Sequence, residues 1–285
     1  MKKIAWIGTG VMGKPMVEHL HQGGYHINAF NRTFEKAKAL EPFVTACSSI
    51  EECVKGAECV FSMVGYPKDV ADVYEEVFKF VDQGTYLIDM TTSSPTLARV
   101  LHTKAEKLGM HMLDAPVTGG DIGAINGTLS IMVGGHEADY AVILPMLQLM
   151  GKRITYMGEA GSGQHAKLAN QIVIAGNVAA VAEAMIYAKD KGLDQEAMLS
   201  VIMGGSAASW QADKNGSKMI KKDYAPGFYI KHFLKDLKLI NSEKGSLPLI
   251  VVERVRKIYQ NLSDQGLYDL GTQAIIEYYL RQLAQ

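Results

Sequence analysis

Residues 4–13 read Ile4-Ala5-Trp6-Ile7-Gly8-Thr9-Gly10-Val11-Met12-Gly13, and this stretch decides the fold. It begins with a short apolar run, as a buried strand does, and continues into glycines with the spacing G-x-G-x-x-G. A helical pattern over 12–22 follows, and a second strand-like run covers 25–30. The glycine motif alone is weak, but in this strand–loop–helix–strand order it predicts a β-α-β unit that binds a pyrophosphate.

Each glycine of this loop has a separate predicted role. Gly8 permits the tight turn, Gly10 lets the backbone approach the pyrophosphate, and Gly13 lets the helix pack closely on the strand. The anion then meets the free N–H groups and the positive dipole end of the helix. We therefore expect a nicotinamide dinucleotide to contact the whole loop, which comprises Gly8, Thr9, Gly10, Val11, Met12 and Gly13.

The tripeptide Asn31-Arg32-Thr33 follows the second predicted strand. An NAD enzyme usually has Asp or Glu near this point for the ribose 2′-hydroxyl, whereas Arg accommodates a 2′-phosphate. Here the chain offers an amide, a guanidinium that can grip phosphate with two N–H groups, and a hydroxyl. The pattern favours NADP(H) and leaves NAD(H) open. The alternative interpretation of Arg32 is a solvated surface residue.

Strand-like and helix-like segments alternate through the first half of the chain. Further strands are predicted at 59–63, 86–89, 111–114 and 129–133, with helices at 70–80 and 95–107. This alternation is typical of a mainly parallel, doubly wound α/β sheet of the Rossmann type. Ligands of such sheets bind at the carboxyl edge. Loop residues Met63, Val64 and Thr92 are therefore predicted to line the cofactor, with ordinary loop residues as the alternative.

The pattern becomes helical after about residue 160. We predict an NADP(H)-binding domain over 1–162 and an all-helical substrate and dimerisation domain over 163–285. A long interdomain helix over about 164–191 joins them. Its apolar part, 168–188, is long enough to span a bilayer, but polar residues interrupt it, so we interpret it as a buried helix of a soluble protein. Because so small a domain can hardly cover this helix, we expect a homodimer or homotetramer.

Bulk composition argues against several classes of protein. Hydrophobic residues make up 48%, charged residues 21% and the net charge is −1, all ordinary for a globular protein. Without a basic stretch, neither nucleic acid nor an anionic membrane is expected as a partner. Cys47, Cys53 and Cys59 lie close together without histidines at ligand spacing. We therefore expect reduced thiols, a cytoplasmic location and no metal site.

Three further segments resemble one enzyme family when they are read together with the glycine loop. They are 114–120 (DAPVTGG), 161–171 (GSGQHAKLANQ) and 235–237 (KDL). In this order they are similar to the substrate loop, the catalytic segment and a cofactor-reaching element of the β-hydroxyacid dehydrogenases. That family includes 3-hydroxyisobutyrate dehydrogenase, tartronate semialdehyde reductase and the glyoxylate/succinic semialdehyde reductases. The resemblance covers the whole chain.

The resemblance implies a role for each matching residue. It makes Lys167 the general acid and base, and it gives Lys235 a contact with the cofactor. Thr118, Gly119 and Gly120 would hold a small carboxylate substrate, since they offer a hydroxyl and open backbone N–H groups. Asn170 and Gln171 follow Lys167 at i+3 and i+4 on one helix face, where they could orient the lysine or the substrate. The implied reaction is reversible hydride transfer between the nicotinamide and a small β-hydroxy acid or semialdehyde.

The residues beside Lys167 also bear on the alternatives. Burial disfavours the charged form of an amine, so a lysine in this apolar helix is suited to proton exchange near neutral pH. Many relatives have serine in place of Thr118, and several have asparagine in place of Gln171. A relative of 6-phosphogluconate dehydrogenase should have a histidine soon after the lysine, and imine reductases generally lack the lysine. An NAD(H)-preferring 3-hydroxyisobutyrate dehydrogenase and a non-catalytic dinucleotide-binding module remain open.

Overall fold

A computed structural model describes residues 1–283 of the chain. The described residues form two compact units, of which the first covers Met1–Lys167 and the second begins at Leu168. The predicted domain boundary, between residues 162 and 163, lies a few residues earlier. Helix α8 (Ser162–Asp190) begins in the first unit and continues into the second.

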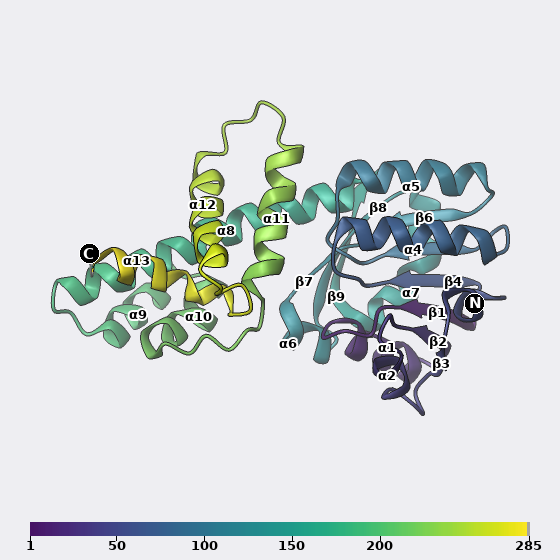
Figure 1. Ribbon diagram of the computed structural model, residues 1–285, viewed down its shortest axis with the longest axis horizontal. Coiled ribbons are helices and arrows are strands. Elements are labelled where there is room, and N and C mark those ends of the chain that lie inside the picture. The colour runs from purple at the N-terminus through teal and green to yellow at the C-terminus, as the bar shows by residue number, and fades with distance from the viewer. Residues whose placement is uncertain (284–285) are drawn as a thin grey trace. The chain divides into compact units, whose positions relative to one another are not determined.

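The first unit is built on one sheet whose order confirms the predicted doubly wound fold (Figure 1). Its order is β3-β2-β1-β4-β5-β6-β8-β7, and β9 also pairs with β8. Neighbouring strands in the part of the order from β3 through β2, β1, β4 and β5 to β6 pair in parallel. Strand β8 is antiparallel to β6 and to β7. The bounds are β1 (Lys3–Ile7), β2 (His26–Phe30), β3 (Thr45–Cys47), β4 (Cys59–Ser62), β5 (Tyr86–Asp89), β6 (His111–Asp114), β7 (Val117–Thr118), β8 (Leu129–Gly134) and β9 (Gly151–Gly158).

Helices cover both faces of this sheet, because its strands are apolar on both sides. Alternate side chains of β1 enter two different cores: Ile4 and Trp6 belong to one, Ala5 and Ile7 to the other. Helices α1 and α7 contribute to the first core, and α3, α4 and α5 to the second. The bounds are α1 (Gly13–Gln22), α2 (Phe34–Lys38), α3 (Ile50–Val54), α4 (Pro67–Phe80), α5 (Pro95–Lys107), α6 (Gly120–Ile125) and α7 (Glu137–Met150).

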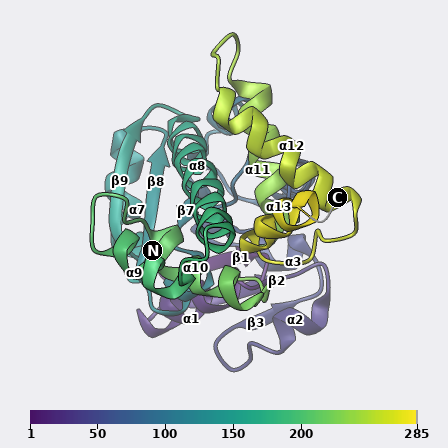
Figure 2. The same ribbon diagram turned by 90° about the vertical axis from the view of Figure 1, so that its left-hand side faces the viewer.

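The second unit is all-helical, as predicted. Figures 1 and 2 both show α11 and α12 side by side, and the rings of Phe233 and Tyr259 meet edge to face at 5.1 Å in the core between them. The bounds are α9 (Gln195–Met203), α10 (Trp210–Lys221), α11 (Ile230–Glu243), α12 (Ile250–Asp264), a short 3₁₀ helix (Thr272–Ile275) and α13 (Ile276–Leu283).

Helix α8 is long and apolar enough to cross a membrane by length and composition alone. In its most apolar window 44% of the residues are buried within the structure, and Val173 and Tyr187 are among its exposed apolar side chains. The helix therefore has both a packed and an open surface, and its interpretation as the helix of a soluble protein stays a prediction.

Candidate active site

The glycine loop has the close contacts that its sequence predicts. Gly8 has φ +100°, and a Cβ there would lie 2.2 Å from the carbonyl oxygen of Met63. A Cβ on Gly13 would lie 2.0 Å from the carbonyl oxygen of Gly8. At Gly10, by contrast, a Cβ would meet no atom of the described residues within 4 Å. Gly8 and Gly13 are thus required by the fold, whereas the described residues leave open space beside Gly10.

This loop lies where the strand order of the sheet reverses. The chain moves outward in one direction through β2 and β3, and in the other through β4, β5 and β6, so β1 and β4 flank the switch point. Met63 follows β4, and its N–H donates to the carbonyl oxygen of Ile7 at 2.8 Å. The N–H of Val64 donates to Thr91 Oγ1 at 3.0 Å. The geometry thus places Met63 and Val64 beside the glycine loop.

Thr9 and Asn31 connect the glycine loop to the end of β2. The N–H of Thr9 donates to Asn31 Oδ1 at 3.0 Å, and Asn31 Nδ2 donates to the carbonyl oxygen of Thr33 at 3.0 Å. Thr9 Oγ1 is buried and has no hydrogen-bond partner among the described residues. A buried hydroxyl without a partner is costly, so it suits a polar ligand. This hydroxyl and the open space at Gly10 fit a dinucleotide.

The side chain of Arg32, a predicted cofactor residue, lies at the surface. Its guanidinium Nη1 lies 3.4 Å from Asp69 Oδ1, and its side chain is 90% exposed. Asp69 is held in place at the start of α4, because its Oδ2 accepts the N–H of Tyr66 at 3.0 Å. The guanidinium is therefore accessible to a phosphate, next to a carboxylate that would repel one.

A buried carboxylate lies under the carboxyl edge of the sheet, at the end of β5. Asp89 Oδ1 accepts from Ser62 Oγ at 2.9 Å and from the N–H of Thr91 at 3.0 Å, and Ser62 Oγ also lies 3.0 Å from Tyr74 OH. Burial raises the pKa of Asp89 to about 6, although these hydrogen bonds oppose the rise. Sequence reasoning did not find this network, because its members come from three separate segments.

The buried Asp89 carboxyl makes stability depend on pH. Between its ordinary pKa and about 6 the folded protein holds a proton that the unfolded chain has released, so stability falls as pH rises through this window. The loss amounts to about 3 kcal/mol above the window. Asp89→Asn lacks this titration and keeps an oxygen for Ser62 and Thr91. Urea unfolding gives the free energy of unfolding of the variant and of wild type. We expect the variant's value, relative to that of wild type, to be about 3 kcal/mol higher at about pH 8 than at about pH 4. If variant and wild type differ in free energy of unfolding by the same amount at both pH values, the raised pKa does not belong to Asp89.

The start of α8 is fastened by Asp114, which ends β6. Asp114 Oδ1 accepts the N–H of Gly161 at 2.7 Å, and Oδ2 accepts the N–H of Gln164 at 2.8 Å. The carboxylate thus caps the first turn of the helix, where a negative charge is favourable. Burial raises the pKa of Asp114, and the two backbone hydrogen bonds lower it.

Gln164 joins the same helix to the loop after β5. Its Nε2 donates to the carbonyl oxygen of Thr91 at 2.7 Å, and its Oε1 accepts the N–H of Ser93 at 2.8 Å. Thr92, a predicted cofactor residue, lies between these two anchor points. Gln164 is fully buried and was not among the predicted site residues. It positions both the loop that carries Thr92 and the helix that carries Lys167.

Lys167 lies on α8, near the predicted substrate loop. Its side chain is buried, and Nζ donates to the carbonyl oxygen of Val117 at 2.8 Å. Thr118 follows directly, and then Gly119 and Gly120 have φ +131° and +66°. A Cβ on Gly120 would meet no described atom within 4 Å, so its backbone can be approached closely. Lys167 and the Thr118-Gly119-Gly120 loop are therefore brought together, as predicted.

The remaining predicted residues form a separate polar cluster within the second unit. Asn170 Nδ2 donates to Gln171 Oε1 at 3.0 Å, and Gln171 Nε2 donates to Asp236 Oδ2 at 2.7 Å. Lys235 Nζ lies 3.1 Å from Asp236 Oδ1. Asp236, absent from the predicted set, thus links Gln171 of α8 to Lys235 of α11. The amide of Gln171 is bound within this cluster, so its predicted contact with substrate stays a prediction.

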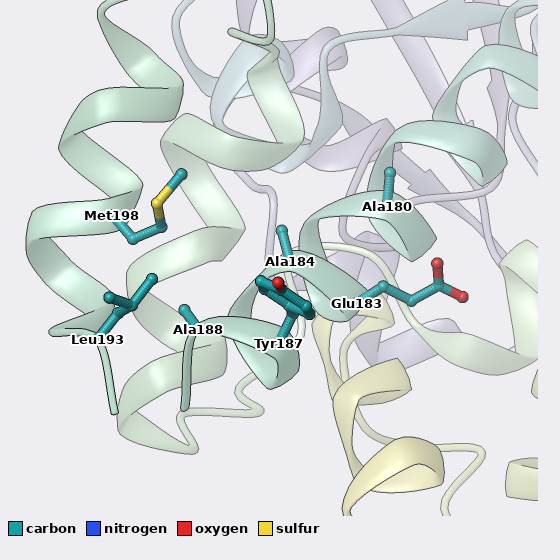
Figure 3. Close-up of a pocket in the computed structure, with 7 residues that line it drawn as sticks. All are labelled: Ala180, Glu183, Ala184, Tyr187, Ala188, Leu193 and Met198. Atoms are coloured by element: carbon teal, nitrogen blue, oxygen red, sulfur yellow. The ribbon is translucent and has the colours of Figure 1, made fainter. Parts of the chain in front are cut away.

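The second unit also contains a groove of ≈ 420 Å³, shown in Figure 3. Its lining comes from the end of α8, the turn after it and α9, and consists of Ala180, Glu183, Ala184, Tyr187, Ala188, Leu193 and Met198. The single charged member, Glu183, accepts from Tyr279 OH at 3.0 Å. No predicted site residue lines this groove, and most of its walls are apolar.

Comparison with known proteins agrees with the two-part pattern of motifs. Residues 3–158 match the model of the NAD-binding domain of 6-phosphogluconate dehydrogenase. Residues 161–279 match the model described as NAD-binding of NADP-dependent 3-hydroxyisobutyrate dehydrogenase. Together, the two family models cover nearly all of the described residues.

Individual relatives are similar over almost their full lengths. The uncharacterized oxidoreductase YkwC of Bacillus subtilis is 41% identical over 98% of this chain and 99% of its own. The 2-hydroxy-3-oxopropionate reductase of Escherichia coli is 36% identical over 96% of each. The solved structure of Mycobacterium tuberculosis 3-hydroxyisobutyrate dehydrogenase with L-serine has a TM-score of 0.89 and 32% identity, covering 97% of this chain and 98% of that one.

These matches and the glycine loop lead to one assignment. Two family models cover consecutive halves of the chain, and relatives named as 3-hydroxy acid dehydrogenases or reductases align over its length. The loop geometry at Gly8, Gly10 and Gly13 independently suits a dinucleotide. The chain therefore belongs to the β-hydroxyacid dehydrogenase family and is an oxidoreductase with a nicotinamide dinucleotide cofactor.

Proposed function

We propose that the protein reversibly transfers hydride between NADP(H) and a small β-hydroxy acid or semialdehyde carboxylate, with Lys167 as general acid and base. The observation that carries this proposal is the buried Lys167 ammonium, hydrogen-bonded to the Val117 carbonyl at the head of the Thr118-Gly119-Gly120 loop. A proton donor thus lies beside a loop that can bind an anion, in a family of dehydrogenases.

The glycine loop and the end of β2 are the residues that would hold the cofactor. The backbone at Gly10 and the start of α1 would bind the pyrophosphate, and Thr9 Oγ1 would gain the hydrogen bond it lacks among the described residues. Asn31, Arg32 and Thr33 would contact the adenosine end, with Met63, Val64 and Thr92 along the carboxyl edge. We also assign Lys235 to the cofactor, on the resemblance of its segment. When bound, the nicotinamide supplies or accepts the hydride.

The protein's own residues would orient the substrate and move the proton. Thr118 Oγ and the N–H groups of Gly119 and Gly120 would bind the substrate carboxylate, which fixes the carbonyl group relative to Lys167. In reduction, Lys167 Nζ gives a proton to the carbonyl oxygen as hydride reaches the carbonyl carbon, and a hydroxyl results. In oxidation, the neutral amine takes the hydroxyl proton while hydride leaves the same carbon. Asn170 and Gln171 would hold the site's polar groups in position.

A substrate panel tests this reaction class. Glyoxylate, succinic semialdehyde, tartronate semialdehyde and methylmalonate semialdehyde are compared with aldehydes of similar size that lack the carboxylate. Because an anion fixes orientation, we expect kcat/KM to be higher for at least one acid than for its uncharged counterpart. Equal kcat/KM for every acid and its counterpart would contradict the assigned role of Thr118, Gly119 and Gly120.

The preference for NADP(H) depends on Arg32. Arg32→Ala removes a guanidinium that can form charge-assisted hydrogen bonds with the 2′-phosphate, each worth about 1.5–3 kcal/mol. We expect KM for NADPH to rise about ten- to a hundredfold while KM for NADH changes little. Steady-state kinetics with both coenzymes measure this. Lys36→Ala, which removes a neighbouring exposed cation on α2, is the control and should alter neither value. Equal losses with NADPH and NADH would show that Arg32 does not recognise the 2′-phosphate, and would contradict its assigned role.

A module that binds the dinucleotide without turning it over is the remaining rival function. It predicts tight binding of NADPH and no oxidation by any semialdehyde. The buried Lys167 and its hydrogen bond support the catalytic proposal, since a binding module has no need of a buried amine beside an anion-binding loop. A homodimer or homotetramer, a cytoplasmic location and the absence of nucleic-acid and membrane partners stay part of the proposal.

A further inference from the structure

Two histidines and a glutamate gather on the first unit, among residues that the proposed reaction does not use. His102 and Glu106 lie one turn apart on α5, and His136 immediately precedes α7. One ligand atom from each of the three lies within 4.8 Å of the others. Helix α5 packs against β6, as Figure 1 shows, and His136 follows β8, the next strand of the sheet. Three potential metal ligands from two elements thus meet in space.

Both histidines direct the same ring nitrogen toward one carboxylate. His102 Nε2 lies 3.6 Å from Glu106 Oε2, and His136 Nε2 lies 2.8 Å from Glu106 Oε1. Neighbouring ligands of a tetrahedral zinc ion, with bonds of about 2.0–2.1 Å, are about 3.3 Å apart. The two histidine–glutamate separations bracket that spacing, and all three ligand atoms lie within 4.8 Å of one another.

The opposite nitrogens of both rings face oxygen acceptors. His102 Nδ1 lies 2.8 Å from the carbonyl oxygen of Met112, and His136 Nδ1 lies 3.9 Å from Glu159 Oε2. A carbonyl oxygen can only accept, so His102 Nδ1 donates this hydrogen bond, and the Nε2 side of the ring faces Glu106. Metal-bound histidines characteristically donate their other N–H to a carbonyl or carboxylate, which fixes the ring.

We propose that His102, Glu106 and His136 form a binding site for a divalent transition-metal ion of the zinc type. Imidazole and carboxylate ligands suit such an ion, and three protein ligands leave the fourth position for water. His102 is buried, whereas Glu106 and His136 are exposed, so the ion can enter from solvent. Met112 and Glu159 orient the two rings. The ion would tie α5 to the start of α7 and stabilise the folded protein by mass action.

Zinc binding to the full-length protein tests the site. After removal of metal with a chelator, the protein is titrated with Zn²⁺ by calorimetry and its thermal unfolding is followed with and without Zn²⁺. We expect one equivalent to bind and to raise the Tm. Co²⁺ is used as a second probe and should give visible d–d absorption without a thiolate charge-transfer band, since the site has no cysteine.

Variants separate this site from other zinc-binding groups. His136→Ala and Glu106→Gln remove exposed ligands, and exposed ion pairs contribute little to stability, so both variants should fold without metal. Each should weaken zinc binding at least about tenfold and abolish the rise in Tm. His26→Gln, which changes an exposed histidine of β2, should bind zinc as wild type does. Failure of wild type to bind, unchanged binding by both ligand variants, or a thiolate band with Co²⁺ would each overturn the proposal.

Discussion

Lys167→Ala is expected to lower kcat for semialdehyde reduction by about 10²–10⁴-fold, which is the usual contribution of a general acid. Nζ of Lys167 is held by the Val117 carbonyl, next to the loop assigned to the substrate carboxylate. Without it, hydride addition leaves an alkoxide that must take its proton from water. Since Lys167 has no assigned contact with the dinucleotide, the Kd of the Lys167→Ala variant for NADPH should stay close to the wild-type value. Steady-state and binding measurements on the same preparation separate the two effects.

The Lys167 variant needs a check on folding, because it leaves a buried carbonyl without its donor, at a cost of about 1–3 kcal/mol. Thermal unfolding with and without NADPH gives that check. Lys189→Ala, at the exposed far end of the same helix, is the matched control and should retain wild-type kcat. Near-normal turnover of every accepted substrate by folded Lys167→Ala would show that another group moves the proton.

Gly10→Val is expected to abolish dinucleotide binding while leaving the free protein as stable as wild type. A side chain at Gly10 meets no described atom within 4 Å, so the fold tolerates it, but it occupies the space assigned to the pyrophosphate. We expect Kd for NADPH to rise at least about a hundredfold, which corresponds to about 2.7 kcal/mol. Fluorescence titration with NADPH and the Tm of the free protein measure the two properties.

Gly13→Ala provides the contrasting control within the same motif. Its Cβ would lie 2.0 Å from the carbonyl oxygen of Gly8, so helix α1 must shift and the free protein should lose stability. We thus expect a substitution at Gly10 to weaken dinucleotide binding, and a substitution at Gly13 to lower the stability of the free protein. A Gly10→Val variant that binds NADPH normally would place the pyrophosphate elsewhere.

The parts of the site that could be predicted from the sequence are local ones. The requirement for glycine at Gly8 and Gly13 arises from contacts within one strand–loop–helix unit, which a short motif encodes. The placement of Lys167 near Thr118 could be anticipated only through the resemblance of both segments to one family. No periodicity within either segment indicates that β7 and the first turns of α8 meet.

The residues that were missed act across long stretches of chain. Gln164 contacts backbone groups of residues 71 and 73 positions away, and the sequence holds no sign of such a pairing. Asp89 accepts from Ser62 of β4, which in turn contacts Tyr74 of α4, and the raised pKa of Asp89 depends on burial. His102 and Glu106 have the spacing of one helical turn, but His136 comes 30 residues after Glu106. The cysteine-based expectation of no metal site did not consider such a set.

Three strands, β3, β7 and β9, were not predicted from the sequence. Strand β3 has 3 residues and strand β7 has 2, too few to show an alternating pattern. Strand β9 lies beside β8 at the margin of the sheet, and its exposed and half-buried residues resemble a polar loop. The predicted strand at 129–133 forms, but it runs antiparallel to β6. The chain reverses there through β7 and α6, and β7 itself pairs antiparallel with β8.

The most direct test of the proposed reaction is to mix the protein with NADPH and each of the four semialdehyde or oxo-acid substrates, and to follow both coenzyme oxidation and product. We expect at least one substrate to be converted, with one hydroxy acid formed for each NADPH oxidised, and more efficiently with NADPH than with NADH. Saturable binding of NADPH without its oxidation by any of the four would rule out the proposed hydride transfer and would favour the binding module.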